Sequence, residues 1–140
     1  MRRFVRALYE RLLIDGELSS QLALITHELL ENAVKYSIDD EASLTVEVLR
    51  KESCLQISVR TSNRASRHHA ERLQKIIGEV QQSDDLFGYF QELIQQTIGR
   101  SQSGLGLARI ACETEMSLRL ETDGDTMDII AWYELRGESQ

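Results

Sequence analysis

Three polar side chains in residues 26–37 (THELLENAVKYS) have the types and the spacing to act on a phosphate. Glu28, Asn32 and Lys35 stand at positions i, i+4 and i+7, so a helix would place them on one face. A carboxylate can act as a general base, a carboxamide oxygen can bind a divalent metal, and an ammonium group can pair with a phosphate. The alternative interpretation is an ordinary solvated helix face with an ion pair between Glu31 and Lys35.

A glycine pair further along the chain adds a second component to the same chemistry. Gly104 and Gly106 flank Leu105 in the sequence SGLGL, directly before a predicted helix. Glycine lets a backbone approach an anion closely, and the free N–H groups and partial positive charge of a helix N-terminus favour a phosphate. The alternative is a helix start that packs tightly against a sheet.

Residues 26–37 are predicted to be the second half of an amphipathic helix. Apolar residues recur at helical spacing and form one stripe, which Leu30 and Val34 widen. Ser19 or Ser20 is expected to cap this helix, which should end near residue 37. The stripe consists of Leu22, Ile25, Leu29, Ala33 and Tyr36.

Alternation and turn signals predict the remaining elements. Two hairpins are expected, from residues 44–50 with 54–60 and from 116–122 with 127–135; the second closes at Asp123-Gly124-Asp125, where turn chemistry explains the aspartates better than a metal site. Further helices are predicted over residues 4–14, 68–82 with Ser66 as cap, 86–98 after a capping signal at 83–85, and 105–115. Residues 61–66 are expected to be a polar loop.

This order of elements predicts an α+β fold with a single domain over residues 1–140. Four strands in two hairpins cannot bury both of their faces alone. Helices collected on one face of a four-stranded, mostly antiparallel sheet solve this problem and give a two-layer α/β sandwich.

The composition excludes several classes of protein. A net charge of −7 argues against nucleic acid as the main partner, because phosphate binding needs a basic surface. No apolar run approaches the roughly 20 residues that span a bilayer, and the N-terminus does not read as a signal peptide. Cys54 and Cys112 lack metal-binding spacing. They are expected to be reduced thiols of a cytoplasmic protein.

The combination E-x-x-x-N-A-x-K-Y on a helix, a hairpin, and S-G-L-G-L before another helix resembles the ATP-binding domain of the histidine-kinase and gyrase (GHKL) superfamily, which has the Bergerat fold. The resemblance covers residues 18–135. It implies ATP and Mg²⁺ as cofactors. The roles that it implies are a general base for Glu28, a magnesium ligand for Asn32, a phosphate-side cation for Lys35, and a second glycine box next to the phosphates for Gly104, Leu105 and Gly106.

The adenine side of the expected site departs from this pattern. The superfamily places D-x-G-x-G after the second strand, where its aspartate binds the adenine amino group, whereas this chain has RTSNRA at residues 60–65. Asn63 is the residue left there to accept from adenine. The sequences VRTSNRAS, SDDLFGYF and SGLGLARIA are similar to the SiaB-like bacterial regulators, in which such a domain acts as a serine/threonine protein kinase in partner-switching signalling.

The sequence therefore leaves three functions open. The first is Mg-ATP-dependent phosphorylation of a serine or threonine on a partner protein. The second is a catalytically silent relative that acts by binding a protein, and the third is a general soluble ATPase. The expected partner is a protein, either a substrate or an anti-sigma-antagonist-like regulator; no membrane is expected, and a homodimer is left open. His27 resembles a phosphoacceptor histidine, although a surface or neighbour-packed histidine fits its position better.

Overall fold

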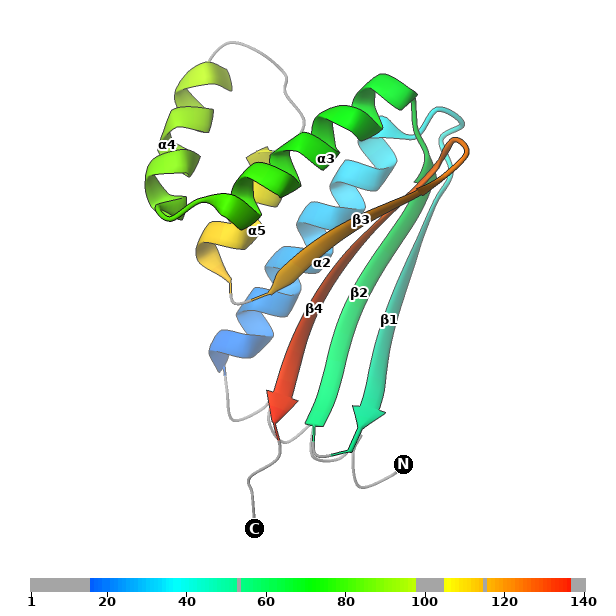
Figure 1. Ribbon diagram of the computed structural model, residues 1–140. Helices are drawn as coiled ribbons and strands as arrows, with labels where there is room; N and C mark the ends of the chain where they lie inside the picture. Colours follow the sequence, from blue (N-terminus) through cyan, green and yellow to red (C-terminus); the bar gives the residue numbers. More distant parts are fainter. Residues whose placement is uncertain (1–15, 53, 98–104, 115, 137–140) are drawn as a thin grey trace.

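The computed structural model describes residues 16–52, 54–97, 105–114 and 116–136, which form an α+β fold (Figure 1). The predicted helix over residues 4–14 and the loop over residues 99–103 lie outside the described residues. The elements are α2 (Gly16–Tyr36), β1 (Ala42–Lys51), β2 (Cys54–Arg64), α3 (Arg67–Gln82), α4 (Leu86–Thr97), α5 (Leu105–Glu113), β3 (Ser117–Asp123) and β4 (Thr126–Arg136).

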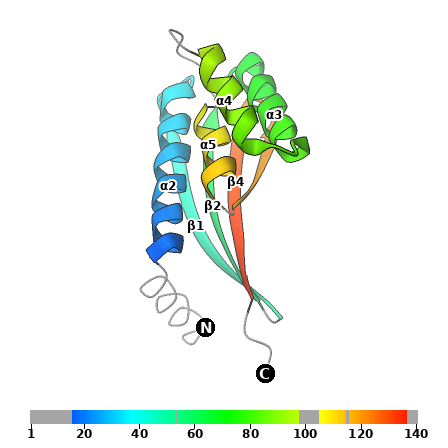
Figure 2. The same ribbon diagram turned by 90° about the vertical axis from the view of Figure 1, so that its left-hand side faces the viewer.

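The strands form one open sheet in the order β1-β2-β4-β3, and all three pairings are antiparallel. Both predicted hairpins are confirmed. The centre of the sheet is the pairing of β2 with β4, which runs from Arg64 opposite Thr126 to Cys54 opposite Arg136. Two views at right angles show the helices on one face of the sheet (Figures 1 and 2). The arrangement is therefore compatible with the predicted two-layer sandwich.

Strand β2 is longer than the sequence predicted, and the predicted loop over residues 61–66 is wrong for its first four residues. Thr61 lies opposite Ile129 and Asn63 lies opposite Met127, so the ladder continues to Arg64. The alternation of buried and exposed side chains continues through this segment, with Thr61 and Asn63 following Val59 on the buried face. It was missed because the buried residues here are polar. This correction moves Asn63 from a loop onto the sheet.

The helix boundaries confirm two predicted caps and correct a third. Ser66 caps α3, where its hydroxyl accepts from the His69 amide at 3.2 Å. Asp85 accepts from the Gly88 amide at 3.0 Å at the start of α4. Helix α2 already contains Ser19 and Ser20, so these serines are not its cap.

Helix α5 ends two residues earlier than predicted, at Glu113. The hydroxyl of Thr114 donates to the Ile110 carbonyl at 2.6 Å and accepts from the Met116 amide at 3.2 Å. A threonine side chain that satisfies the last-turn backbone groups in this way competes with continuation of the helix.

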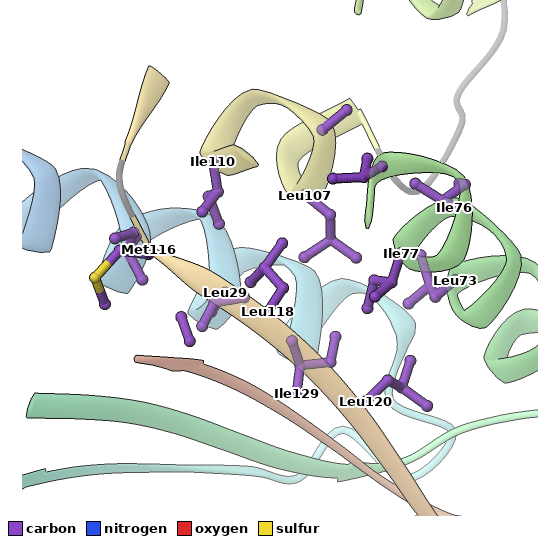
Figure 3. Packing of buried hydrophobic residues seen from close by; sticks show 14 of the residues in the cluster. Leu29, Leu73, Ile76, Ile77, Leu107, Ile110, Met116, Leu118, Leu120 and Ile129 are labelled. Atoms are coloured by element: carbon purple, nitrogen blue, oxygen red, sulfur yellow. The ribbon is translucent and has the colours of Figure 1, made fainter. Parts of the chain in front are cut away.

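A single hydrophobic cluster fills the space between the helices and the sheet (Figure 3). Ile25, Leu29 and Ala33 of α2 are fully buried, which confirms the predicted stripe. Leu30 and Val34 are 37% and 55% exposed, so they do not widen it. Residues contributed by the other elements include Leu73, Ile76, Ile77, Leu107, Ile110, Met116, Leu118, Leu120 and Ile129.

Strand β1 is the least covered part of the sheet. Val46 lies directly opposite Val59 of β2, and side chains opposite each other share one face of a sheet. Val59 is 1% exposed under the helices, whereas Val46 is 55% exposed, and its neighbours Leu44 and Val48 are also exposed. In the part of the chain that the structure describes, the helix layer therefore covers β2, β4 and β3 better than β1.

Candidate functional site

The structure brings Glu28 of α2 against Gly106 in the first turn of α5. These residues come from the two motifs that the sequence analysis singled out, and α2 packs directly on α5. A Cβ atom added at Gly106 would collide with Glu28 Oε2 and lie 3.4 Å from Glu28 Cδ. The absence of a side chain at residue 106 is thus what lets the carboxylate reach the start of α5.

Arg109 completes this contact with a positive charge. Its Nη1 lies 3.6 Å from Glu28 Oε1, and its Nε lies 2.6 Å from Glu113 Oε2. The carboxylate of Glu113, and then that of Glu28, raise the pKa of the Arg109 guanidinium above its ordinary value. The side chain of Glu28 is 18% exposed. A largely buried carboxylate is thereby held between the Arg109 guanidinium and the N-terminus of α5.

Asn32 lies one turn beyond Glu28 on α2, and its amide nitrogen is buried without a hydrogen-bond partner in the described residues. A buried donor that lacks a partner costs about 1–3 kcal/mol, so such groups are uncommon in folded proteins. They occur where a water, an ion or a ligand supplies the missing contact. The amide nitrogen of Asn32 is thus shielded from solvent as well as unpaired, so another molecule would reach it only after local rearrangement.

Two further buried polar atoms that have no hydrogen-bond partner in the described part of the chain lie on elements next to α2. They are Thr61 Oγ1 on β2 and His69 Nε2 on α3. Helix α2 packs on β2, and it meets α3 where Tyr36 stacks on His69 with the ring centroids 3.8 Å apart. Three elements that pack together thus each contribute an unpaired polar group to the region between the helices and the sheet.

His69 is neutral at physiological pH. Burial, and then the positive charges of Arg72 and His68, lower the pKa of His69 to about 4. An imidazole of this kind can hydrogen-bond to a ligand without adding charge to the site.

Asn63 lies on the helix-facing side of β2 and is 5% exposed. Its Nδ2 donates to the Arg64 carbonyl at 3.2 Å, which leaves the side-chain oxygen as the group able to accept from a ligand. It also lines a depression of about 270 Å³ together with Asp39 and Arg64. The geometry thus retains the acceptor that the sequence analysis assigned to this position.

Lys35 lies on the exposed side of α2 rather than beside Glu28. Its ammonium lies 5.2 Å from the centroid of the Tyr36 ring, and the side chain borders a shallow surface with Leu30 and Val34. Glu31 does not make the expected contact with Lys35, since its Oε2 lies 2.9 Å from Nε2 of His27. The side chain of His27 is 70% exposed.

The second glycine box is described only in part. Gly104 lies outside the described residues, and Leu105 provides the first backbone position of α5. Of the three residues that the sequence analysis placed there, Gly106 is the one whose surroundings the structure gives in full.

Sequence reasoning missed Arg109, Thr61 and His69. Arg109 could have been found, because it follows Gly106 at i+3 and so shares a helix face with it. Thr61 could have been found by continuing the alternation of β2 beyond residue 60. Nothing in the local sequence indicates the stacking of His69 on Tyr36, because it depends on how α2 and α3 cross.

A charged contact ties the loop after α2 to the β3–β4 turn at the same end of the sheet. Arg64 pairs with Asp125 through Nε at 3.0 Å and lies 3.6 Å from Asp39. The hydroxyl of Ser37 donates to Asp39, and the amide of Glu41 returns to Ser37 Oγ at 3.1 Å. Asp125, which the sequence analysis assigned to turn chemistry, thus also holds Arg64 in place.

Among the described residues, no helix has the length and apolarity to cross a membrane, and no three His, Cys, Asp or Glu side chains are grouped to hold a metal ion. Comparison with protein-family models finds none that matches the chain, and comparison with curated proteins finds no significant match.

Proposed function

We propose that the chain is a cytoplasmic, Mg-ATP-dependent serine/threonine protein kinase of the GHKL type, with its phosphate site where α2 meets the first turn of α5. The observation that carries the proposal is the contact between Glu28 and Gly106. Two motifs far apart in the sequence meet in space, and they are the two that the superfamily uses to bind phosphate. The identity of the nucleotide as ATP is inferred from the resemblance, and the contact between Glu28 and Gly106 supports a phosphate site at this place.

Asn32 fits a magnesium ion that receives most of its ligands from elsewhere. Mg²⁺ usually keeps several waters and takes one or two protein oxygens together with substrate phosphates, so it does not require a cluster of carboxylates. The ligand of the ion would be the side-chain oxygen of Asn32, whereas the unpaired atom is the nitrogen, a donor that cannot bind a cation, so the metal role of Asn32 rests on the resemblance. When bound, the ion would neutralise charge that develops on the transferred phosphoryl group.

Glu28 would accept the proton of the partner's serine or threonine hydroxyl. A carboxylate is a suitable general base, and Arg109 at 3.6 Å keeps this one oriented toward α5. Asn63 and the buried hydroxyl of Thr61 would offer an acceptor and a donor to the base of the nucleotide. The resulting partner switching, in which phosphorylation changes what the partner binds, follows from the resemblance.

One observation favours the alternative of a silent relative that works by binding a protein. The Glu28 carboxylate already lies at the N-terminus of α5, where a phosphate would bind, and it is paired there with Arg109. A phosphate would have to share or displace this position. In the silent relative, Glu28 and Arg109 would only join two helices.

Calorimetric titration with Mg-ATP, combined with measurement of the slow ADP formation in which water replaces the partner's hydroxyl as phosphoryl acceptor, separates the two functions. For the kinase we expect binding by the unmodified chain, weaker binding by Asn32→Ala, and binding without ADP formation by Glu28→Gln. Glu31→Gln is the matched control, because Glu31 is an exposed carboxylate on the same helix. Failure of the unmodified chain to bind millimolar Mg-ATP would contradict the kinase and leave the silent relative.

A further inference from the structure

A groove of about 720 Å³ lies between α3 and the edge strand β3, away from the contact of Glu28 with Gly106. Figure 1 shows α3 running beside β3, with the first turn of α3 near the turn that joins β3 to β4. Apolar side chains that include Ala70, Leu120 and Met127 are part of the lining, and Arg67, Glu71, Gln74, Thr122 and Asp125 add polar groups.

The groove is closed at one end and open at the other. Near the end of α3, Gln81 Nε2 donates to the Leu118 carbonyl at 2.9 Å and ties the helix to the strand. The residues that line the groove come instead from the first half of α3 and the second half of β3. Leu120 is 7% exposed, while Thr122 is exposed because the helix no longer covers it.

Within the residues that the structure describes, the backbone of β3 presents hydrogen-bonding groups without a partner to this groove. The Leu118 carbonyl bonds to α3, so it faces away from β4, and every second residue of a strand shares this direction. The two-residue turn between Asp123 and Thr126 leads to the same result. Asp123 is hydrogen-bonded to Thr126 across the turn, so the backbone groups of the alternate residues, Thr122 and Leu120, point away from β4. The N–H and C=O groups of Leu120 and Thr122 therefore point outward, and β4 is the strand that pairs with β3 in the described sheet.

We propose that this groove binds an extended, basic segment of a partner protein, which adds to the sheet as a strand beside β3. Main-chain groups of Leu120 and Thr122 would pair with the segment, and the helix would form the opposite wall, as in other sites of strand addition. The proposal does not depend on nucleotide binding.

The charge of the chain and the two-residue period of a strand predict the kind of residues in the partner's segment. The two carboxylates of the lining are already paired, Glu71 with Arg67 at 3.1 Å and Asp125 with Arg64, so the charge that attracts a segment is the net charge of −7 of the whole chain. Lysine or arginine is therefore favoured over acidic residues. Alternate side chains of a strand point to one face, so apolar residues would recur at every second position and meet Ala70 and Leu120.

The probe is a set of short synthetic peptides in which valine alternates with lysine or threonine. Fluorescence anisotropy measures their binding to the full chain, and amide chemical shifts in NMR spectra locate it. We expect binding that shifts the amides of Leu120 and Thr122. Peptides with glutamate in place of lysine, and peptides methylated at alternate amide nitrogens, should bind at least about tenfold more weakly because charge attraction or a main-chain hydrogen bond is lost.

Two variants test the site without touching the core. Thr122→Pro removes an outward N–H and leaves the pairing with β4, which proline at an edge permits, so binding should weaken about tenfold. Val46→Pro is its control, because the Val46 amide points outward from the other edge of the sheet. Gln74→Trp should fill the groove and abolish binding, whereas Lys75→Trp places the same ring on a neighbouring exposed position outside the lining.

The outcomes are decisive in both directions. Loss of binding in Thr122→Pro and Gln74→Trp, with both controls unaffected, supports the proposal. The absence of binding to every peptide, equal binding by the acidic set, or shifts that map to β1 would overturn it. Concentration-dependent dimerisation that Thr122→Pro abolishes, measured by sedimentation, would assign the groove to a second copy of the chain and also overturn it. None of these results affects Mg-ATP binding, so the two proposals fail separately.

Discussion

At the scale of single residues, the space at Gly106 decides where the Glu28 carboxylate lies. The atom that a side chain at residue 106 would strike is the far end of Glu28, which can rotate away without moving the backbone. Position 106 should therefore control the chemistry of Glu28 with little effect on the stability of the fold.

Gly106→Ala is the variant that tests this. We expect an unfolding free energy within about 1 kcal/mol of the unmodified chain, because alanine favours a helix while Glu28 loses its contact with Arg109. ADP formation should fall sharply if Glu28 is the base. Gly78→Ala is the matched control, since nothing lies within 4 Å of its added Cβ, and it should stabilise α3 by about 0.5–1 kcal/mol. Urea denaturation and an ADP assay measure both effects, and an unchanged activity in Gly106→Ala would contradict the role of this contact.

His69 makes stability depend on pH in a defined window. Its pKa is about 4 in the folded chain and 6.5 in the unfolded chain, so the unfolded chain binds more protons between these values. The free energy of unfolding should therefore fall as the pH drops from about 6.5 to about 4, by on the order of 2 kcal/mol, with no further change from this group outside the window. The difference between the unmodified chain and His69→Phe isolates the effect, and His27→Gln, at a histidine whose side chain is 70% exposed on α2, should behave like the unmodified chain. Parallel pH profiles for all three proteins would contradict it.

How much of the candidate site the sequence reveals depends on the kind of contact. Glu28 and Gly106 could be paired in advance because each belongs to a motif with a recognisable composition. The unpaired state of Asn32, Thr61 and His69 could not, because it depends on which groups the packing leaves within hydrogen-bonding distance. The structure makes these residues candidates, and their role stays a prediction.

At the scale of elements, the helices were more predictable than the ends of the strands. The stripe of α2 is narrow, and the boundary between buried and exposed positions falls between consecutive residues, Leu29 and Leu30. The end of β2 was missed because its pairing with β4 stabilises polar residues that local preference assigns to a loop. Tertiary partners that lie far along the chain are invisible to a local pattern.

The sharp boundary on α2 gives a direct test. Leu29→Ala should lower the free energy of unfolding by about 2–5 kcal/mol, because the side chain is fully buried and a cavity would remain. Leu30→Ala removes the same atoms from a side chain that is 37% exposed and should cost about 1 kcal/mol or less. Urea denaturation of both variants measures the difference. Equal losses would show that the two faces of α2 are buried alike in solution.

At the scale of the whole molecule, the helix layer is offset from the sheet. The helices cover β2, β4 and β3, and the apolar side chains of β1 on the same face are left exposed in the described part of the chain. The fold class and the order of the elements followed from the sequence, whereas this offset did not. The offset depends on where each helix packs on the sheet. The alternation of apolar and polar residues in β1 would be the same with or without a helix over this strand.

Lysine substitutions at two valines that lie opposite each other on β1 and β2 test this offset. Val46→Lys should change the free energy of unfolding by about 0.5 kcal/mol or less, because its side chain remains in solvent. Val59→Lys, at the position directly opposite, should cost more than about 3 kcal/mol or prevent folding, since it buries a charge. Thermal and urea denaturation would show the difference. A severe effect of Val46→Lys would indicate that β1 is covered in the complete chain.

The position of β4 in the middle of the sheet has a consequence for synthesis of the chain. Strand β2 is completed at Arg64, but its central partner begins at Thr126, after three helices and β3 have been made. Until then the ribosome presents a two-stranded hairpin with an open edge, and a hairpin of this size is barely stable alone. Pairings between such distant residues form slowly. The nascent chain therefore exposes apolar strand surface while residues 65–125 are made, a little under half of the 140-residue chain, and we expect chaperones that bind extended apolar segments to recognise it during this interval.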